Sequence, residues 1–330
     1  MEDKDKRPVN MSPPQWIILI FILLIFIGSI LLSLPIAAAD GKSIGWLNAL
    51  FTATSAVCVN GLVVVDTGST FSTFGQVVIM TLIQIGGLGF MTLGVLVAIV
   101  LGKRISLKER LVIQQTTQSH STQGLIKLSL YIFYIAFSFE IVATLILTLR
   151  WMGEMGFSQA FYYAIFHSIS AFNNAGFALW SNSLSSYIND PIVNLTIIIL
   201  FVSGGLGYLV IVEIFQKRKW RKFSLHTKIV LLSSGILLVS GFLFLLILES
   251  WNGATFGSLT WGERLSAAFF QSATPRSAGF NTIDIGNMLS SSQLFLIILM
   301  FIGASSGGTG GGIKTNTFVV LILATLNTFR

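Results

Sequence analysis

The segment GASSGGTGGGIKTNTF, from Gly303 to Phe318, is the part of the sequence that most suggests chemistry. Six of its first ten residues are glycine, and a Lys-Thr pair follows. A phosphate-binding P-loop reads G-x-x-x-x-G-K-[ST], with glycine directly before lysine. Here Ile313 separates Gly312 from Lys314, and both flanks are apolar runs. The segment therefore predicts a break within an apolar helix, not a nucleotide site.

Three other segments share residues that lead up to a glycine. They are FTATSAVCVNGL from Phe51, FHSISAFNNAGF from Phe166 and FQSATPRSAGF from Phe270, and starting the third at Phe269 aligns all three without gaps. The shared glycines are Gly61, Gly176 and Gly279. A second glycine cluster follows each of them, at 86–89, 204–207 and 307–310. The recurrence predicts three copies of one structural unit in the same orientation.

A cation is the ligand that such a unit suits. A short helix that enters a membrane from outside points its partly negative C-terminal end at the membrane centre. A strand returning from that helix can offer carbonyl oxygens in place of a cation's hydration shell, and glycine permits the backbone this needs. The predicted cation-binding residues are Val59, Asn60 and Gly61, then Asn174, Ala175 and Gly176, then Ser277, Ala278 and Gly279.

Polar residues near these loops are candidates for bracing them. Arg276 is expected to turn away from the strand and bond backbone carbonyls or an acid, because a cation inside a cation filter is unfavourable. Asn173 is expected to do the same without charge. Glu140 interrupts an apolar run, and an intramembrane acid is either functional or a structural hydrogen-bonding group. Lys314 either braces the glycine segment or extends to the membrane interface.

Composition identifies the solvent of these elements. Of 330 residues, 53% are hydrophobic and 10% are charged, with mean hydropathy +0.81, whereas soluble domains have about 25% charged residues. The sequence predicts an all-α integral membrane protein. Crossing a membrane takes about twenty apolar residues, which gives spans at 15–34, 76–101, 125–149, 192–215, 227–248 and 293–329, the last interrupted by glycines. Shorter half-polar segments at 46–56, 158–171 and 259–273 are predicted to be re-entrant helices. The single cysteine, Cys58, excludes an internal disulfide.

Basic residues predict the orientation. Residues 1–14 hold three Lys or Arg, residues 103–127 hold five and residues 217–228 hold six, against three in the opposite loops. The positive-inside rule places the first three groups, and the N-terminus, in the cytoplasm. Their position between spans argues against nucleic acid as a partner. The opposite loops are acidic, which either attracts cations to a pore mouth or reflects ordinary solvated residues.

These signals divide the chain into six parts. They are a cytoplasmic N-terminus at 1–14, a first repeat at 15–102, a cytoplasmic linker at 103–124, a second repeat at 125–215, a basic cytoplasmic linker at 216–226 and a third repeat at 227–330, which contains the glycine segment 303–312. Each repeat is predicted to be a span, a pore helix, a filter loop and a second span.

The motifs NAGF, TPRSAGFNT and GASSGGTGGGIKTNTF resemble the Trk/Ktr/HKT superfamily of cation-translocating subunits, most of all the bacterial Ktr membrane subunits. The resemblance covers the whole chain. It implies potassium uptake across the bacterial plasma membrane through a filter of four pseudo-equivalent loops. Glycine at the position of Gly61 accompanies potassium selectivity in that family, and serine accompanies sodium selectivity in some plant members. The resemblance also implies a homodimer on a ring of cytosolic nucleotide-binding regulatory subunits, and it leaves sodium dependence open.

The same resemblance implies that the glycine segment is an intramembrane gate below the filter. The gate residues are Gly303, Ala304, Ser305, Ser306, Gly307, Gly308, Thr309, Gly310, Gly311 and Gly312, with Lys314 beyond them. The family has four repeats and this sequence has three, so we expect the remainder to be missing and these 330 residues alone not to conduct.

Three alternatives remain. The first is a sodium-selective or poorly selective cation pore of the same superfamily. The second is a secondary transporter with inverted repeats, which three repeats in one orientation disfavour. The third is a membrane enzyme acting on a nucleotide, disfavoured because the acidic metal ligands are lacking. We therefore expect no enzyme activity and no bound cofactor, with potassium as substrate. The basic segment KRKWRKF from Lys217 contacts either anionic membrane lipid or the regulatory subunit.

Overall fold

The computed structural model describes residues 13–89 and 125–329, and every helix named below lies within those ranges. The α-helices are α1 (Pro13–Ser33), α2 (Trp46–Cys58), α3 (Thr67–Thr70), α4 (Thr73–Leu88), α7 (Leu125–Met155), α8 (Phe157–Phe172), α9 (Pro191–Leu206), α10 (Tyr208–Lys217), α11 (Leu225–Glu249), α12 (Trp261–Ala273), α13 (Ser290–Phe301) and α14 (Thr315–Thr328). Short 3-10 turns lie at Pro35–Ala37, Ser185–Tyr187, Trp220–Lys222, Phe256–Ser258 and Ile285–Asn287. The fold is therefore helical, as predicted.

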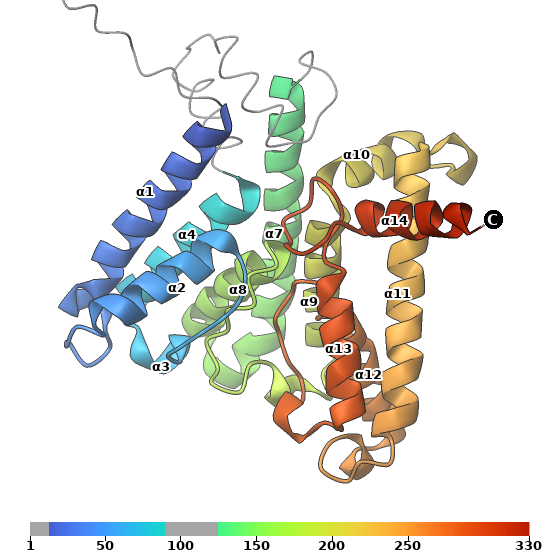
Figure 1. The fold of residues 1–330 in the computed structure, drawn as a ribbon. Helices are drawn as coiled ribbons and strands as arrows, with labels where there is room; N and C mark the ends of the chain where they lie inside the picture. The colour runs from blue at the N-terminus through green and yellow to red at the C-terminus, as the bar shows by residue number, and fades with distance from the viewer. Residues whose placement is uncertain (1–12, 90–124, 330) are drawn as a thin grey trace, which may run out of the picture.

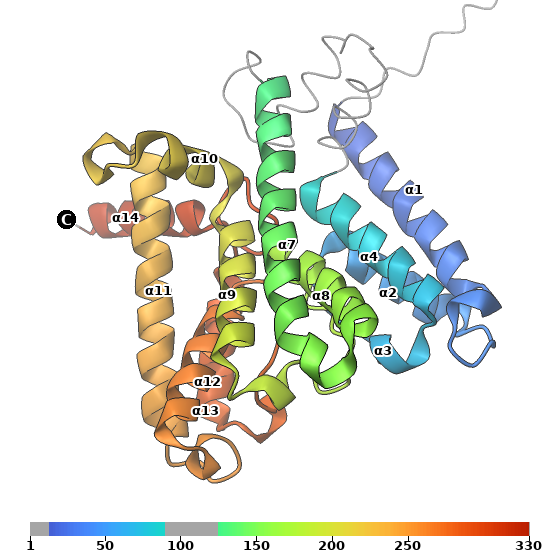
Figure 2. The same cartoon turned by 180° about the vertical axis from the view of Figure 1, so that it is seen from behind.

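The helices associate in three groups along the chain. Helix α1 packs on α2 and α4, α7 packs on α8 and α9, and α11 packs on α12 and α13. Figure 1 shows the first group at one edge, the third at the other and α7, α8 and α9 between them, and Figure 2 gives the same order from behind. Each group thus contains one helix, α2, α8 or α12, that leads into a glycine loop.

Polar caps fix where several helices begin. The Asp190 side chain accepts hydrogen bonds from the amides of Ile192 and Val193 at the start of α9, where proline occupies the first turn. Thr260 and Glu263 form a capping box at the start of α12. These side chains satisfy amide groups that have no partner inside a helix. The caps place the entry to each helix within one or two residues.

The outer faces of the helices are apolar. Helix α11 exposes Leu232, Ile236, Val239, Leu243 and Ile247 along its length. By length and composition, α7 over Leu130–Met155 and α11 can cross a membrane, and the bent pair of α9 and α10 makes a third if it is one span. Other apolar helices, including α4, α13 and α14, are shorter. The described helices fit a multi-pass membrane protein.

Two of the predicted spans are interrupted. The prediction of one continuous span at 192–215 is wrong, because α9 ends at Leu206 and α10 leaves it at an angle of 100°. Gly207 joins them with φ of 91°, a conformation that favours glycine. The predicted interruption of 293–329 is confirmed, since α13 ends at Phe301 and α14 begins at Thr315.

Figure 1 shows that α14 then runs crosswise over α11 and does not continue the direction of α13. Residues 90–101 of the predicted first-repeat span and the whole linker 103–124 lie outside the described residues. Most of the N-terminal segment 1–14 lies outside them too.

Candidate functional site: three converging glycine loops

The loops that follow α2, α8 and α12 meet at their glycines. A Cβ atom added to Gly61 would lie 2.9 Å from the carbonyl oxygen of Ala175. One added to Gly176 would lie 2.8 Å from the carbonyl oxygen of Ala278, and one added to Gly279 would lie 3.0 Å from the Cα atom of Gly176 and 3.9 Å from that of Gly61. The structure thus brings the predicted glycines together from segments far apart in the sequence.

The loops share a backbone pattern as well as a location. The residue two positions before each glycine is left-handed, with φ of 55° at Val59, 59° at Asn174 and 80° at Ser277. The glycines themselves have φ of 73°, 69° and 81°. Left-handed backbone is uncommon for residues other than glycine. Three loops that repeat it at the same offset have the same local conformation, which the sequence alignment alone did not reveal.

Buried hydroxyl groups anchor the second and third loops. Ser170 donates a hydrogen bond to the carbonyl of Phe177 at 2.7 Å, and Thr274 donates one to the carbonyl of Phe280 at 2.6 Å. Thr274 lies one residue closer to its glycine than Ser170 does. The stretch from the anchoring hydroxyl to the glycine is therefore one residue shorter in the third loop, so the gapless alignment from Phe269 pairs the glycines but not these two hydroxyl groups. In the first loop, the Ser55 hydroxyl bonds the Asn60 side chain instead.

Glycines at the ends of α4 and α9 allow these helices to touch the loops. A Cβ atom on Gly86 would lie 2.1 Å from the carbonyl oxygen of Val57, and one on Gly204 would lie 1.9 Å from that of Phe172. Both carbonyls belong to the last turn of a short helix, α2 or α8. The two GGLG clusters thus have the same role: each lets a helix come close to the backbone of the short helix that precedes a glycine loop.

The glycine segment between α13 and α14 is held by hydrogen bonds. Internally, the amide of Gly303 bonds the carbonyl of Ile313 at 3.0 Å, and the amide of Ala304 bonds that of Gly311 at 3.1 Å. Three backbone bonds join the segment to the end of α9 and the start of α10: Ser305 to Gly205 at 2.9 Å, Thr309 to Gly204 at 3.0 Å, and Tyr208 to Gly307 at 3.1 Å. The Lys314 ammonium donates to the carbonyl of Gly310 at 2.7 Å, which favours the bracing alternative.

The same segment contacts two of the glycine loops. Thr309 accepts a hydrogen bond from the Asn174 amide at 2.7 Å and donates one to the carbonyl of Phe172 at 3.2 Å. The amide of Gly311 donates to the Ser277 hydroxyl at 2.8 Å. The segment that was expected to be a gate below the filter therefore makes direct hydrogen bonds to these loops. It is paired at both ends and tied to the residues that precede Gly176 and Gly279.

Of the two predicted bracing residues, Asn173 bonds a backbone carbonyl and an acid as expected, whereas Arg276 does not. Arg276 was expected to bond backbone carbonyls or an acid, but its guanidinium donates to the hydroxyl of Ser234 at 3.1 Å and to that of Thr315 at 3.4 Å. Thr315 in turn donates to the carbonyl of Gly303 at 3.1 Å. No acid contacts Arg276 among the described residues. Arg276 therefore links the third loop to α11 and to the start of α14.

Asn173 turns away from its loop toward α4 and α7. Its amide nitrogen donates to Gln84 at 2.8 Å, to Glu140 at 3.3 Å and to the carbonyl of Ile169 at 2.9 Å. Glu140 is the intramembrane acid singled out in the sequence, and it is 4% exposed. In the sequence, Gln84 is marked only as a polar side chain inside an apolar run. In the structure it hydrogen-bonds both Glu140 and Asn173.

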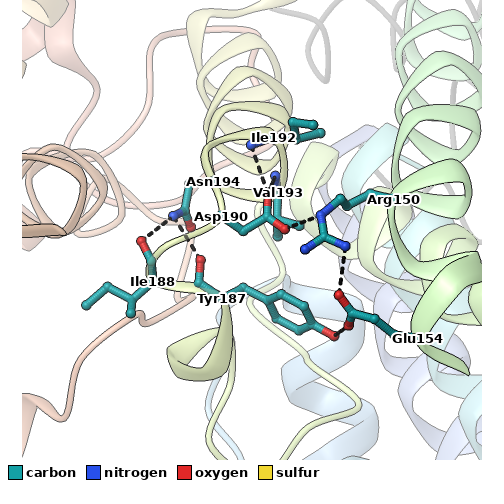
Figure 3. Close-up of polar contacts among 8 residues, drawn as sticks. All are labelled: Arg150, Glu154, Tyr187, Ile188, Asp190, Ile192, Val193 and Asn194. Carbon is teal, nitrogen blue, oxygen red and sulfur yellow. Dashed lines mark hydrogen bonds and ion pairs between the residues drawn. The ribbon is translucent and has the colours of Figure 1, made fainter. Parts of the chain in front are cut away.

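Acidic residues opposite the basic linkers are engaged locally. Figure 3 shows Arg150 of α7 between Glu154, at 2.7 Å, and Asp190, at 2.5 Å, while Tyr187 donates to Glu154 at 3.1 Å. Five other acids accept hydrogen bonds from nearby backbone amides: Asp40, Asp66, Glu249, Glu263 and Asp284. These contacts give the acids structural roles, and Asp190 and Glu249 are buried, so these two are not ordinary solvated loop residues.

Comparisons with known proteins agree on one family. The family model described as TrkH, cation transport protein, matches residues 2–330. The Ktr system potassium uptake protein B of Bacillus subtilis is 46% identical over 100% of this chain and 74% of its own length. The protein of the same description from Vibrio alginolyticus is 44% identical over 99% of this chain and 72% of its length.

Two further matches extend this comparison. The potassium/sodium uptake protein NtpJ of Enterococcus hirae is 38% identical, over 95% of this chain and 69% of its own length. The crystal structure of the potassium transporter TrkH from Vibrio parahaemolyticus superposes with a TM-score of 0.72 at 21% identity. That match covers 100% of this chain and 64% of the TrkH chain, and it supports the fold.

Proposed function

The chain belongs to the TrkH family of cation transport proteins, and from that membership we propose that it is the pore-forming membrane subunit of a Ktr-type potassium uptake system. Two of its relatives are described as Ktr potassium uptake proteins at 46% and 44% identity. The described relatives are transport proteins, which agrees with a transporter and not an enzyme. Potassium is the substrate in this proposal.

The convergence of Gly61, Gly176 and Gly279 is the observation that carries the proposal. The carbonyls of Ala175 and Ala278 lie against the neighbouring loop, where a cation passing between the loops would meet them. Carbonyl oxygens can replace the hydration shell of potassium. The proposed filter comprises residues 59–61, 174–176 and 277–279, as three loops of a pseudo-four-fold ring with channel-like permeation.

The residues 303–312, with Lys314, are the proposed intramembrane gate. Their glycines form a non-helical segment, which membranes tolerate only where protein or water surrounds it. The contacts of Thr309 and Gly311 with two loops put this segment directly against the proposed filter. A cytosolic regulatory subunit with a nucleotide-binding fold would control the gate by moving α14.

The proposed assembly is a homodimer in the bacterial plasma membrane, with the N-terminus in the cytoplasm. The linkers 103–124 and 216–226 then lie on the cytoplasmic side, where the basic linker contacts anionic lipid or the regulatory subunit. The excess of Lys and Arg in these segments supports the orientation. Uptake that depends on sodium as well as potassium is compatible with this arrangement.

A sodium-selective or poorly selective pore is the second candidate. The description of the Enterococcus hirae relative as a potassium/sodium uptake protein is the observation that favours it. The two candidates share a pore and differ only in which cation the loops prefer.

Rubidium uptake tests the proposal and separates the two candidates. The native gene is expressed, with the regulatory subunit, in a bacterium that lacks potassium uptake, and rubidium influx is measured against rising potassium or sodium. We expect potassium to compete strongly and sodium weakly. Equal competition would favour the poorly selective pore, and no influx would contradict the proposed function.

A further inference from the structure

A buried polar cluster joins three helices behind the second glycine loop. Gln84 of α4 donates to one Glu140 oxygen at 3.1 Å, and Asn173 donates to the other at 3.3 Å. Asn173 also donates to Gln84 at 2.8 Å. Glu140 is 4% exposed and Asn173 is fully buried. Each member contacts the other two, so moving one side chain disturbs the whole cluster.

Among the described residues, only neutral donors bond the Glu140 carboxyl. None of the ion pairs among the described residues includes it, and both of its described hydrogen-bond donors are amides. Removing a charge from water without a paired charge is unfavourable. The cluster also lies beside the C-terminal end of α8, which carries partial negative charge. A carboxyl group is therefore an unusual choice at this place for packing alone.

Asn173 connects this cluster to the loop. It is the cap residue of α8, and the next three residues are the proposed filter residues Asn174, Ala175 and Gly176. Its side-chain oxygen has no hydrogen-bond partner among the described residues. A Cβ atom on Gly87 would lie 2.1 Å from that oxygen, so α4 approaches closely enough to confine the Asn173 side chain. The Asn173 rotamer is thus fixed by α4 on one side and by Glu140 on the other.

We propose that Glu140 is the positioning residue of the second glycine loop, holding Asn173 so that the carbonyls before Gly176 keep the geometry that prefers potassium. This inference rests on the proposed function. Glu140 does not touch the cation. It acts through Asn173, and Gln84 completes the arrangement by bonding both residues.

Exchanging the carboxyl and the amide between two helices gives the sharpest test. Glu140→Ala removes the acceptor of both amides, and we expect the preference for potassium over sodium to fall about tenfold. In Glu140→Gln, the new side-chain amide faces the amide donors of Gln84 and Asn173. We expect a smaller fall in the preference for potassium than in Glu140→Ala. The double variant Glu140→Gln/Gln84→Glu exchanges the carboxyl and the amide between α7 and α4. It gives Asn173 a carboxylate partner again, and we expect the preference to return to within about twofold of wild type.

Two measurements separate positioning from simple loss of folding. The first is rubidium uptake with sodium competition, in which the KM for potassium and the maximal rate are fitted separately and corrected for protein in the membrane. The second is the thermal stabilisation of purified protein by potassium compared with sodium. Thr148→Val is the matched control, because Thr148 is buried on the same helix and, among the described residues, its hydroxyl bonds the carbonyl of Thr144 alone. We expect this variant to retain wild-type preference.

Each outcome decides a different statement. Wild-type preference in Glu140→Ala, or a double variant no better than Glu140→Gln, would overturn the positioning role. A fall in the amount of membrane protein with unchanged preference and unchanged ion-specific stabilisation would also overturn it. Wild-type protein without rubidium uptake would instead contradict the proposed function, and the inference would fall with it.

Discussion

Gly176 is the most confined of the three loop glycines. A Cβ atom there would lie 2.8 Å from the carbonyl oxygen of Ala278 and 2.9 Å from the Cα atom of Gly279. Its φ of 69° adds strain of about 1–2 kcal/mol for any other residue. We therefore expect Gly176→Ser to lower the preference for potassium over sodium at least tenfold, with Gly61→Ser and Gly279→Ser acting in the same direction. Rubidium uptake with sodium competition measures this change.

Gly235 provides the control for that series. It lies within α11, and nothing is found within 4 Å of an added Cβ atom. Gly235→Ala should therefore keep wild-type selectivity and gain slightly in helix stability. Unchanged selectivity in all three loop variants would refute the filter assignment.

Residue types predicted these glycines better than they predicted the partners of the polar side chains. The glycines recur at the end of similar segments, so one sequence contains the pattern. The partners of Arg276, and two of the three partners of Asn173, lie on other helices, and no local pattern indicates which helices meet. Arg276 consequently bonds two hydroxyl groups where an acid or a carbonyl was expected. Gln84 could have been noticed as a polar residue in an apolar run.

At the scale of elements, the segment between α13 and α14 gives a prediction about flux. Deleting 305–310 removes its bonds to α9 and α10 and its Thr309 contacts. We expect cation flux to rise several-fold and to depend less on the regulatory subunit. We also expect some loss of selectivity, because Asn174 loses its partner. Flux into cells with and without the regulatory subunit measures the first two effects. A flux equal to that of wild type would count against a gate.

Thr309→Val separates the two effects of that deletion. The change keeps the segment and its backbone bonds but removes the hydroxyl that contacts Asn174 and the carbonyl of Phe172. Leaving buried polar groups unpaired costs about 1–3 kcal/mol. We expect reduced selectivity with little gain in flux, as measured by sodium competition against total rubidium influx. A large gain in flux without loss of selectivity would show that this contact only closes the gate.

The bend between α9 and α10 depends on Gly207. A Cβ atom there would lie 2.6 Å from the carbonyl oxygen of Ser306, and φ is 91°. We expect Gly207→Ala to lower the free energy of unfolding by about 1–3 kcal/mol, since left-handed strain and the clash add. Thermal unfolding of the purified protein in detergent measures this, with Gly235→Ala as reference. Equal melting temperatures for the two variants would contradict the close packing seen here.

Element existence was predictable because apolar length and short half-polar runs are local properties. The break in the span at 192–215 was not, because both halves are apolar and the glycine cluster at 204–207 does not reveal which distant segment it contacts. The bend is stabilised from outside, where the Tyr208 amide bonds the carbonyl of Gly307. The glycine segment between α13 and α14 was predictable as a break. Its hydrogen bonds were not predictable, because they join it to the end of α9 and the start of α10, which lie far away in the sequence.

For the molecule as a whole, the orientation can be tested with one reactive group. The sequence contains a single cysteine, Cys58, so a Cys58→Ser background is free of thiols. Arg221→Cys and Trp251→Cys place thiols just before and just after α11, near its opposite ends. A membrane-impermeant thiol reagent added to intact cells should label Trp251→Cys and leave Arg221→Cys unlabelled until the cells are opened. The reverse pattern would contradict the proposed cytoplasmic N-terminus.

Helix α14 has the form of a lever. Its 14 residues extend about 21 Å at the usual rise of 1.5 Å per residue. The fulcrum is Thr315. Its hydroxyl donates a hydrogen bond to the carbonyl of Gly303 and accepts one from the Arg276 guanidinium, so the glycine segment and the third loop both attach there. A tilt of about 10° moves the far end by about 3.5 Å, while atoms beside the fulcrum shift by a fraction of that. A force applied near Thr328 would therefore act on the hydrogen bonds at Thr315 through an arm of about 21 Å, and it would also act on the contacts between α14 and α11.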